Sequence, residues 1–187
     1  GEDSPFYDQD VRQAFWMSIN FDEIAQYVLG GGTVMTQWIP DGFEGYDPDL
    51  PAYEYNPEKA KEILAASSYD GREITLYSAS STFMSEDQLL AISDYATAVG
   101  FKCSVKILDN ASLQPIRESG QYDIFVAPAN FADASPTLNM MARIRNDQDK
   151  HMFWDDQLMT ALEKGSSSFD KATRETYYHD AMARMRE

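Results

Sequence analysis

Apolar and polar residues follow two different rhythms along the chain. Over residues 101–107 they alternate one by one, which is typical of a β-strand with one solvated face. Short apolar runs at residues 74–77 and 122–127 predict two more strands. Apolar residues spaced as in a helix lie between these strands. The order strand–helix–strand–helix–strand requires right-handed crossover connections and therefore predicts a mainly parallel sheet.

Helical spacing dominates the rest of the chain, and several helices begin with capping residues. Asp10 and Gln13 have the spacing of a capping box. Asn20 and Glu23 repeat this spacing at the next predicted helix. Asn56 precedes a proline, which is favoured at the first helical position because an N–H there would have no partner. The predicted helices are residues 11–19, 21–29, 57–64, 86–99, 112–118, 136–144, 155–164 and 170–186.

Length and composition place these elements in one domain. The chain has 187 residues, of which 43% are hydrophobic and 13% aromatic, so it is long and apolar enough to bury a core. Residues 30–56 are rich in Gly, Pro, Asp and Tyr, but their aromatic side chains predict a packed loop rather than a free linker. The predicted fold class is α/β, a mainly parallel sheet flanked by helices.

The net charge is strongly negative and narrows the choice of partners. Fifteen basic residues against thirty-one acidic ones give a net charge of −16 at pH 7. Such a surface repels nucleic acid phosphates and anionic lipids, so we expect neither as a partner. No apolar run approaches the length of about 18 residues that predicts a membrane span, so we expect no direct insertion into a membrane. The single cysteine allows no internal disulfide.

The sequence contains no pattern typical of an active site or a metal centre. Cys103 lies on the apolar face of its predicted strand, where burial makes a thiol unreactive. His151 and His179 have no cysteine or second histidine at metal-ligand spacing, and His179 is expected on a solvated helix surface. The serines at 78–81 lack the frame of a serine hydrolase and either cap a helix or contact a ligand. We predict no catalytic residue, no metal and no cofactor.

A lone carboxylate, Asp133, follows the predicted strand at residues 122–127. In an open α/β sheet, ligands bind beyond the carboxyl ends of the strands, because the loops converge there. A carboxylate at that edge can pair with a ligand ammonium, which contributes about 1.5–3 kcal/mol. Asp133 can equally cap the helix predicted to begin near Ser135. The residues alone leave both interpretations open.

Five segments together resemble the family 5 extracellular solute-binding proteins of ABC transporters, which include oligopeptide-, dipeptide- and nickel-binding proteins. In chain order they are "DVRQAFWMSINFDEIAQYVLGG", "IPDGFEGYDPDLPAYEYNPEKAKEILAASSYDG", "ATAVGFKCSVKI", "ESGQYDIFVAPANFAD" and "WDDQLMTALEKGSSSFDKATRETYYHDA". The second of these, residues 39–71, resembles the most recognisable segment of the family. The resemblance covers essentially the whole chain.

This resemblance implies a function in transport. Family members have two lobes that close on a solute and deliver it to a permease. Residues 1–187 are then a single α/β lobe, on the C-terminal side of a larger protein whose first lobe is absent, and not an enzyme. The implied partners are a peptide or other small amine-bearing solute and the membrane subunits of an ABC permease. The implied location is extracellular or periplasmic, with a lipid anchor in the full-length protein.

The resemblance also suggests ligand-binding residues. In peptide-binding members an acid beyond this strand pairs with the amino terminus of the peptide, and Asp133 stands in its place. Asn130 and Phe131 belong to the same stretch, but Asn130 stands where the family has a tryptophan. This departure weakens the prediction that the solute is a peptide. The prediction that the solute carries an amine is unchanged. By their position in the resembling loop, Trp38 and Gln37 are further ligand-binding candidates.

A sensing function is the alternative. Related modules can be fused to regulatory proteins, where the chain would act as a ligand-sensing or interaction domain without a transport role. The upstream sequence distinguishes the two, because a leader with a lipid-bearing cysteine predicts transport and a DNA-binding helix pair predicts regulation.

Overall fold

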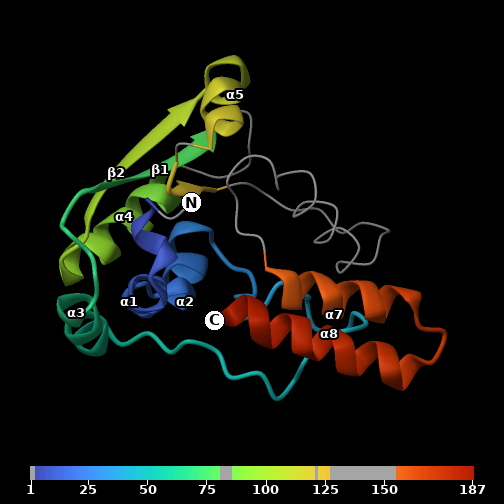
Figure 1. The fold of residues 1–187 in the computed structure, drawn as a ribbon. Helices are drawn as coiled ribbons and strands as arrows, with labels where there is room; N and C mark the ends of the chain where they lie inside the picture. The colour runs from blue at the N-terminus through green and yellow to red at the C-terminus, as the bar shows by residue number, and fades with distance from the viewer. Residues whose placement is uncertain (1–2, 81–85, 121, 127–154) are drawn as a thin grey trace. The chain divides into compact units, whose positions relative to one another are not determined.

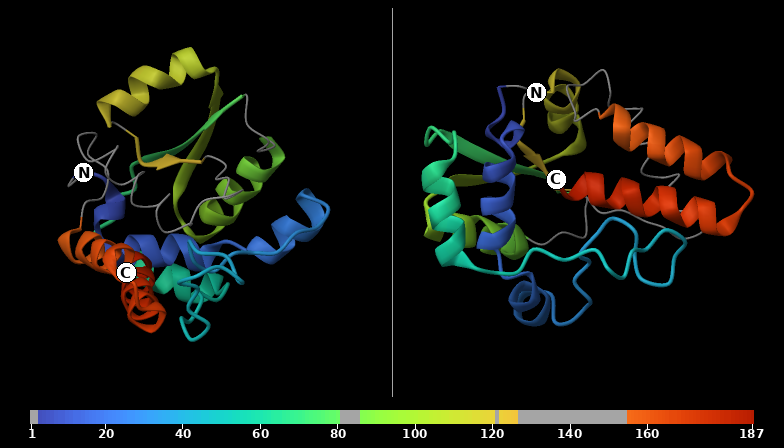
Figure 2. Two further views of the ribbon diagram at one scale, coloured as in Figure 1. Left: turned by 90° about the vertical axis from the view of Figure 1, so that its right-hand side faces the viewer. Right: turned by 60° about the horizontal axis from the view of Figure 1, so that its bottom comes forward.

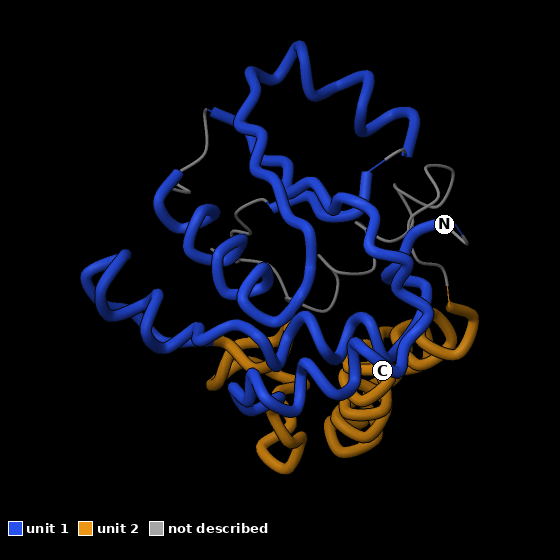
Figure 3. The backbone as a smooth tube through the Cα atoms, turned by 90° about the vertical axis from the view of Figure 1, so that its left-hand side faces the viewer, with its two compact units in different colours: residues 1–34, 53–129 blue, residues 35–52, 130–187 orange. Residues whose placement is uncertain are grey.

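The computed structural model describes residues 3–80, 86–120, 122–126 and 155–187. The chain divides into two compact units, which Figure 3 colours separately. Unit 1 consists of Gly1–Val34 and Tyr53–Ala129, and unit 2 of Met35–Ala52 and Asn130–Glu187. Each unit is described by itself below. The prediction that residues 1–187 form one lobe stays a prediction.

Unit 1 contains a parallel sheet, as the sequence predicts. Its strands are β1 (Glu73–Ala79), β2 (Lys102–Leu108) and β3 (Ile124–Phe125), in the order β2-β1-β3. Both pairings are parallel, with Ile74 opposite Cys103 and Leu76 opposite Ile124. Among the described residues 122–126 of the third predicted strand, Ile124 and Phe125 form β3, and β1 is the central strand.

Two helices make the crossovers of this sheet (Figure 1). Helix α4 (Glu86–Val99) joins β1 to β2, and α5 (Asn110–Ser119) joins β2 to β3. Helix α4 packs against the sheet face that carries Leu76. The guanidinium of Arg117 in α5 lies 5.2 Å from the ring centre of Phe125, which points to the opposite face because it is paired with Tyr77. The sheet is thus flanked by helices on both faces (Figure 2).

The first helix is capped differently from the sequence prediction. Helix α1 spans Gln9–Ser18 and is preceded by a short 3-10 turn, η1 (Pro5–Tyr7). Its N-cap is Asp8, whose carboxylate accepts a hydrogen bond from the backbone N–H of Asp10 at 2.9 Å. The same carboxylate accepts two more from Ser68, which lower its pKa. The prediction of Asp10 as the N-cap was wrong. Asp8 takes this position, because its carboxylate also binds Ser68, which is 60 positions away.

The other two predicted starts are confirmed. The side chain of Asn20 accepts from the N–H of Glu23 at 3.0 Å and caps α2 (Phe21–Glu23). Asn56 caps α3 (Pro57–Ala66) by accepting from Lys59 N–H at 2.9 Å.

The predicted helix at 21–29 continues from α2 as a π-helix, η2 (Ile24–Val28). In this wider turn the N–H of Leu29 donates to the carbonyl of Ile24 at 3.1 Å. The chain then ends the turn at Gly30, whose φ of 74° lies in the left-handed region.

The core of unit 1 forms where α1, α3 and α4 meet the sheet. The residues buried there are Val11, Ala14, Phe15, Ile19, Ile24, Ala60, Leu64, Ile74, Leu76, Ile92, Ala96, Val99 and Phe101.

The described part of unit 2 is a helix pair packed on the segment 35–52. The helices are α7 (Asp156–Ser167) and α8 (Lys171–Arg186), which confirm two of the predicted helices; the third, at 136–144, lies outside the described residues. The buried cluster consists of Ile39, Leu158, Met159, Leu162, Ala181 and Met182. Within the described part of the chain, no helix is both long and apolar enough to cross a membrane.

Two glycines in unit 2 leave room for a buried tyrosine. Tyr178 in α8 is only 3% exposed. A Cβ atom on Gly165 would lie 2.3 Å from the Tyr178 ring, and one on Gly45 would lie 2.8 Å from the Cβ of Tyr178. These distances are too short for real contacts, so both positions need glycine.

Candidate functional site

The carboxyl edge of the parallel sheet is where the fold favours a ligand site. At this edge the ends of all three described strands are joined by backbone hydrogen bonds. The N–H of Ser80 donates to the carbonyl of Leu108, and the N–H of Val126 donates to the carbonyl of Tyr77, both at 2.8 Å. The position at which the chain leaves each strand is therefore fixed.

A buried serine and an ion pair hold β3 at both ends. The hydroxyl of Ser78, 1% exposed, donates to the carbonyl of Val126 at 3.0 Å. Just before β3, the carboxylate of Asp123 accepts from Arg72 at 2.5 Å and from the hydroxyl of Ser4 at 3.1 Å. The sequence did not reveal these anchors, because their partners are distant in the chain. They fix the strand from which the predicted ligand-binding stretch leaves.

Three of the predicted ligand-binding residues, Asp133, Asn130 and Phe131, lie outside the described residues. Their assignment stays a prediction. Among the described residues, the acid directly after β2 is Asp109, and it already has a structural task. Its carboxylate caps α5 by accepting from both the N–H and the hydroxyl of Ser112 at 2.9 Å, which lowers its pKa.

The other two candidates, Gln37 and Trp38, lie in unit 2. The side-chain amide of Gln37 donates to the carbonyl of Asp47 at 2.8 Å and accepts from its N–H at 3.0 Å. These two hydrogen bonds join Gln37 to Asp47 and close the loop between them, in the way that backbone hydrogen bonds join two paired strands. Trp38 is half-buried and packs against the hydrophobic cluster of unit 2. Both side chains thus stabilise the loop, and a ligand contact for either stays a prediction.

Cys103 and His179 are side chains that could suggest catalysis or metal binding, and their environments favour neither. Burial raises the pKa of the Cys103 thiol to about 11, so the reactive thiolate is scarce at neutral pH. His179 is not a purely solvated side chain as expected, because its Nε2 lies 3.1 Å from the carbonyl of Tyr46. Its Nδ1 lies 3.9 Å from the carboxylate of Asp47. Within the described ranges, no group of three or more His, Cys, Asp and Glu side chains could hold a metal ion.

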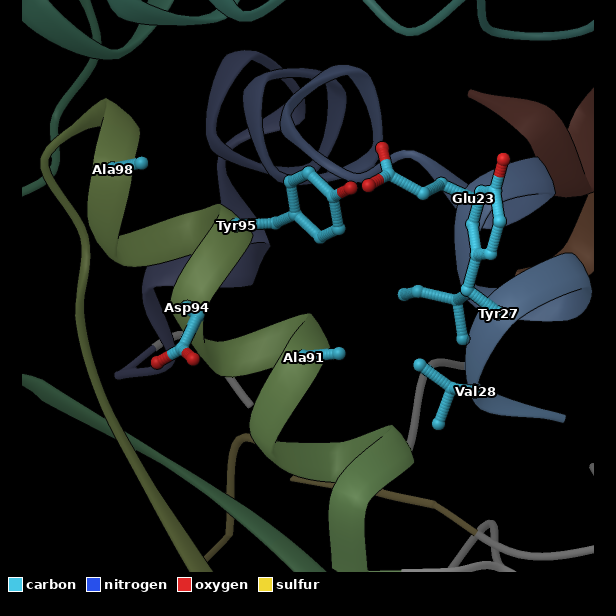
Figure 4. Close-up of a pocket in the computed structure, with 8 residues that line it drawn as sticks. Glu23, Tyr27, Val28, Ala91, Asp94, Tyr95 and Ala98 are labelled. Carbon is cyan, nitrogen blue, oxygen red and sulfur yellow. The ribbon is translucent and has the colours of Figure 1, made fainter.

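A groove of about 410 Å³ lies in unit 1 between η2 and α4 (Figure 4). It is lined by Glu23, Ile24, Tyr27, Val28, Ala91, Asp94, Tyr95 and Ala98. No local pattern in the sequence indicates this groove, because its two walls are far apart in the chain.

Known proteins with similar sequences bind different solutes. A probable di/tripeptide-binding protein of Pseudomonas aeruginosa is 24% identical over 189 residues, covering 95% of this chain and 35% of that protein. Heme-binding protein A of Haemophilus influenzae is 35% identical over 69 residues, covering 36% of this chain and 13% of that protein.

The fold is shared with solved structures. The crystal structure of a dipeptide-binding protein from Pseudoalteromonas in complex with Met-Leu superposes with a TM-score of 0.84 at 15% identity. The match covers 99% of this chain and 39% of that one, so the chain spans well under half the length of such proteins.

The family assignment rests on most of the sequence. Residues 2–151 match the family described as bacterial extracellular solute-binding proteins, family 5, middle part. This match confirms the resemblance seen in the sequence: the chain belongs to the family 5 bacterial extracellular solute-binding proteins.

Proposed function

We propose that this chain is part of the solute-binding component of an ABC importer. It contributes one lobe of the cleft that captures a peptide or another small amine-bearing solute and delivers it to a permease. The observation that carries the proposal is the family match over residues 2–151. The whole protein acts outside the cytoplasmic membrane, where a lipid anchor keeps it near the permease. The chain binds its solute without breaking a bond.

The recognition chemistry that we propose centres on Asp133. Support comes from the position of β3: Ser78 holds its exit at the carboxyl edge of the sheet, and the Arg72–Asp123 ion pair holds its other end. Asp133 follows that exit by a few residues. Its carboxylate pairs with the ammonium group of the solute, a charged hydrogen bond of about 1.5–3 kcal/mol. An amine is therefore the feature that the solute must carry.

Binding by this chain alone is expected to be weak. Ligands of such sites are usually buried over about 70–90% of their surface, and one lobe provides only one wall. We expect a Kd of about 1 mM, which corresponds to about −4 kcal/mol. A submicromolar Kd for any peptide would show that the chain forms a complete site.

Calorimetry with Met-Leu and with its N-acetylated form tests the proposal. Acetylation removes the ammonium group and should abolish binding. Asp133→Asn should weaken binding of Met-Leu about tenfold, the equivalent of 1.4 kcal/mol. Asp41→Asn, at an exposed carboxylate, is the matched control and should change nothing. Equal binding of both peptides would contradict the role of the amine.

A further inference from the structure

The groove between η2 and α4 has an apolar floor. Ile24 is buried at its base, and Val28 and Ala91 are half-buried beside it. Figure 4 shows Ala91 and Val28 facing one another across the gap. Because Ala91 and Ala98 are small, the α4 side of the groove leaves space for the side chains of a second molecule. The floor suits aliphatic side chains.

The opposite wall is formed by the π-helix. Its wide turn is closed by the Leu29 to Ile24 hydrogen bond and by a second from the N–H of Gly31 to the carbonyl of Ala25 at 2.8 Å. Single π-turns cost stability and occur frequently at functional sites. Here the turn places Tyr27, 74% exposed, on the rim of the groove. A phenol ring exposed in this way offers its face to a cation.

The acidic rim is organised by tyrosines. Tyr95 hydrogen-bonds Glu23, and Figure 4 shows the two side chains pointing toward one another. Burial and this hydrogen bond raise the pKa of Tyr95 to about 12, so its hydroxyl remains a donor. The ring of Tyr95 also packs edge-on against Tyr55, with centroids 5.8 Å apart. Glu23 is therefore held in place at the groove before any partner arrives.

Charge identifies the kind of partner. The charged side chains among the residues lining the groove are Glu23 and Asp94, and both are acidic. The whole chain carries −16, which disfavours a second copy of the same chain and an anionic lipid surface. A cationic partner gains from both the local and the overall charge.

We propose that this groove docks a basic amphipathic segment of a partner protein. Aliphatic side chains of the segment occupy the floor formed by Ile24, Val28 and Ala91. Its Lys or Arg side chains reach Glu23 and Asp94, with one cation over the ring of Tyr27. This docking is separate from solute capture and does not depend on the identity of the solute.

Fluorescence anisotropy with a labelled helical peptide made of Leu and Lys tests the groove. The same peptide with Glu in place of Lys is the charge control and should not bind. Tyr27→Ala and Asp94→Lys should each weaken binding about fivefold, as expected for the loss of one cation–π or charge contact. Tyr27→Phe keeps the ring and should bind as the unaltered chain does.

Two matched variants separate the groove from the general negative charge. Glu118→Lys makes the same charge change on α5, and Tyr7→Ala removes another exposed tyrosine, from η1. Neither should alter binding more than about twofold. Equal weakening by Glu118→Lys and Asp94→Lys would overturn the proposal, since binding would then follow net charge alone. Concentration-dependent dimerisation that Tyr27→Ala abolishes would place a second copy in the groove and would also overturn it.

Discussion

The two units of the chain are stabilised in different ways. In unit 1 a parallel sheet and three helices bury a broad hydrophobic core, and β1 has a neighbouring strand on each edge. The described part of unit 2 has a smaller cluster, in which buried residues of α7 and α8 surround Ile39 and the half-buried Trp38, Tyr46 and Leu50 pack against them. Polar contacts to distant parts of the chain add to it, including Arg174–Glu44 at 2.6 Å and Arg184–Asp155 at 2.7 Å. Unit 1 thus has the larger hydrophobic core, whereas unit 2 combines a smaller cluster with close packing around Tyr178 and with these ion pairs.

Removing one buried leucine from each core tests this comparison most strongly. Leu76→Ala in β1 and Leu162→Ala in α7 should each lower the free energy of unfolding by about 2–5 kcal/mol, because both side chains are fully buried. Hydrogen exchange should accelerate in β1, β2 and α4 for the first variant, and in α7 and α8 for the second. Equal acceleration across both sets of elements for either variant would show that the two units do not behave as separate cores.

Two glycines in one loop test how much close packing contributes to the stability of unit 2. Gly42 and Gly45 both have positive φ, 86° and 94°, so an alanine at either costs about 1–2 kcal/mol of backbone strain. Gly45→Ala should cost about 1–3 kcal/mol more, because its Cβ meets Ile39 and Tyr178, whereas a Cβ on Gly42 meets nothing within 4 Å. Urea unfolding measures the difference. Equal effects of the two substitutions would contradict the close packing around Tyr178.

The smallest expected effect concerns pH. The hydrogen bonds from Arg184 lower the pKa of Asp155. A lowered pKa in the folded state gives stability that is present above the ordinary carboxyl pKa of about 4 and is lost as pH falls through the folded value. Asp155→Asn keeps an oxygen for the cap of α7 and should cost about 0.5–1 kcal/mol at pH 7.

The pH dependence provides the check. The difference in melting temperature between the unaltered chain and Asp155→Asn should shrink as pH is lowered from 7 toward 2.5, since the carboxylate becomes protonated. A difference that stays constant with pH would mean that the ion pair contributes nothing.

The sequence predicts those parts of the fold that depend on neighbouring residues. The Asn56 cap, the strand around Leu76 and the parallel order all follow from local patterns and from the handedness of crossovers. The π-turn at Ile24 was missed, because a change from four to five residues per hydrogen bond leaves the apolar spacing almost unaltered. The environment of His179 was missed because its partner, Tyr46, is 133 positions away.

The candidate site, too, could be predicted only where it depends on neighbouring residues. The family could be identified from short segments, and the sheet edge follows from the strand order. The anchors of β3 could not be predicted, since the hydroxyl of Ser78 and the guanidinium of Arg72 reach partners 48 and 51 positions away, at the two ends of the strand. For Gln37, position in a family segment suggested a ligand contact, but the pairing with Asp47 became visible only in three dimensions.

The central place of β1 has a consequence for how the chain is made. Both neighbours of β1 come later in the sequence, so a ribosome that has completed Glu73–Ala79 has produced neither partner strand. One edge of this apolar strand stays open until Lys102–Leu108 emerges, and the other until Phe125 does. Open strand edges invite pairing with other chains, and parallel sheets close slowly. During synthesis, a chaperone that covers β1 would therefore protect an open apolar strand until both partner strands have emerged.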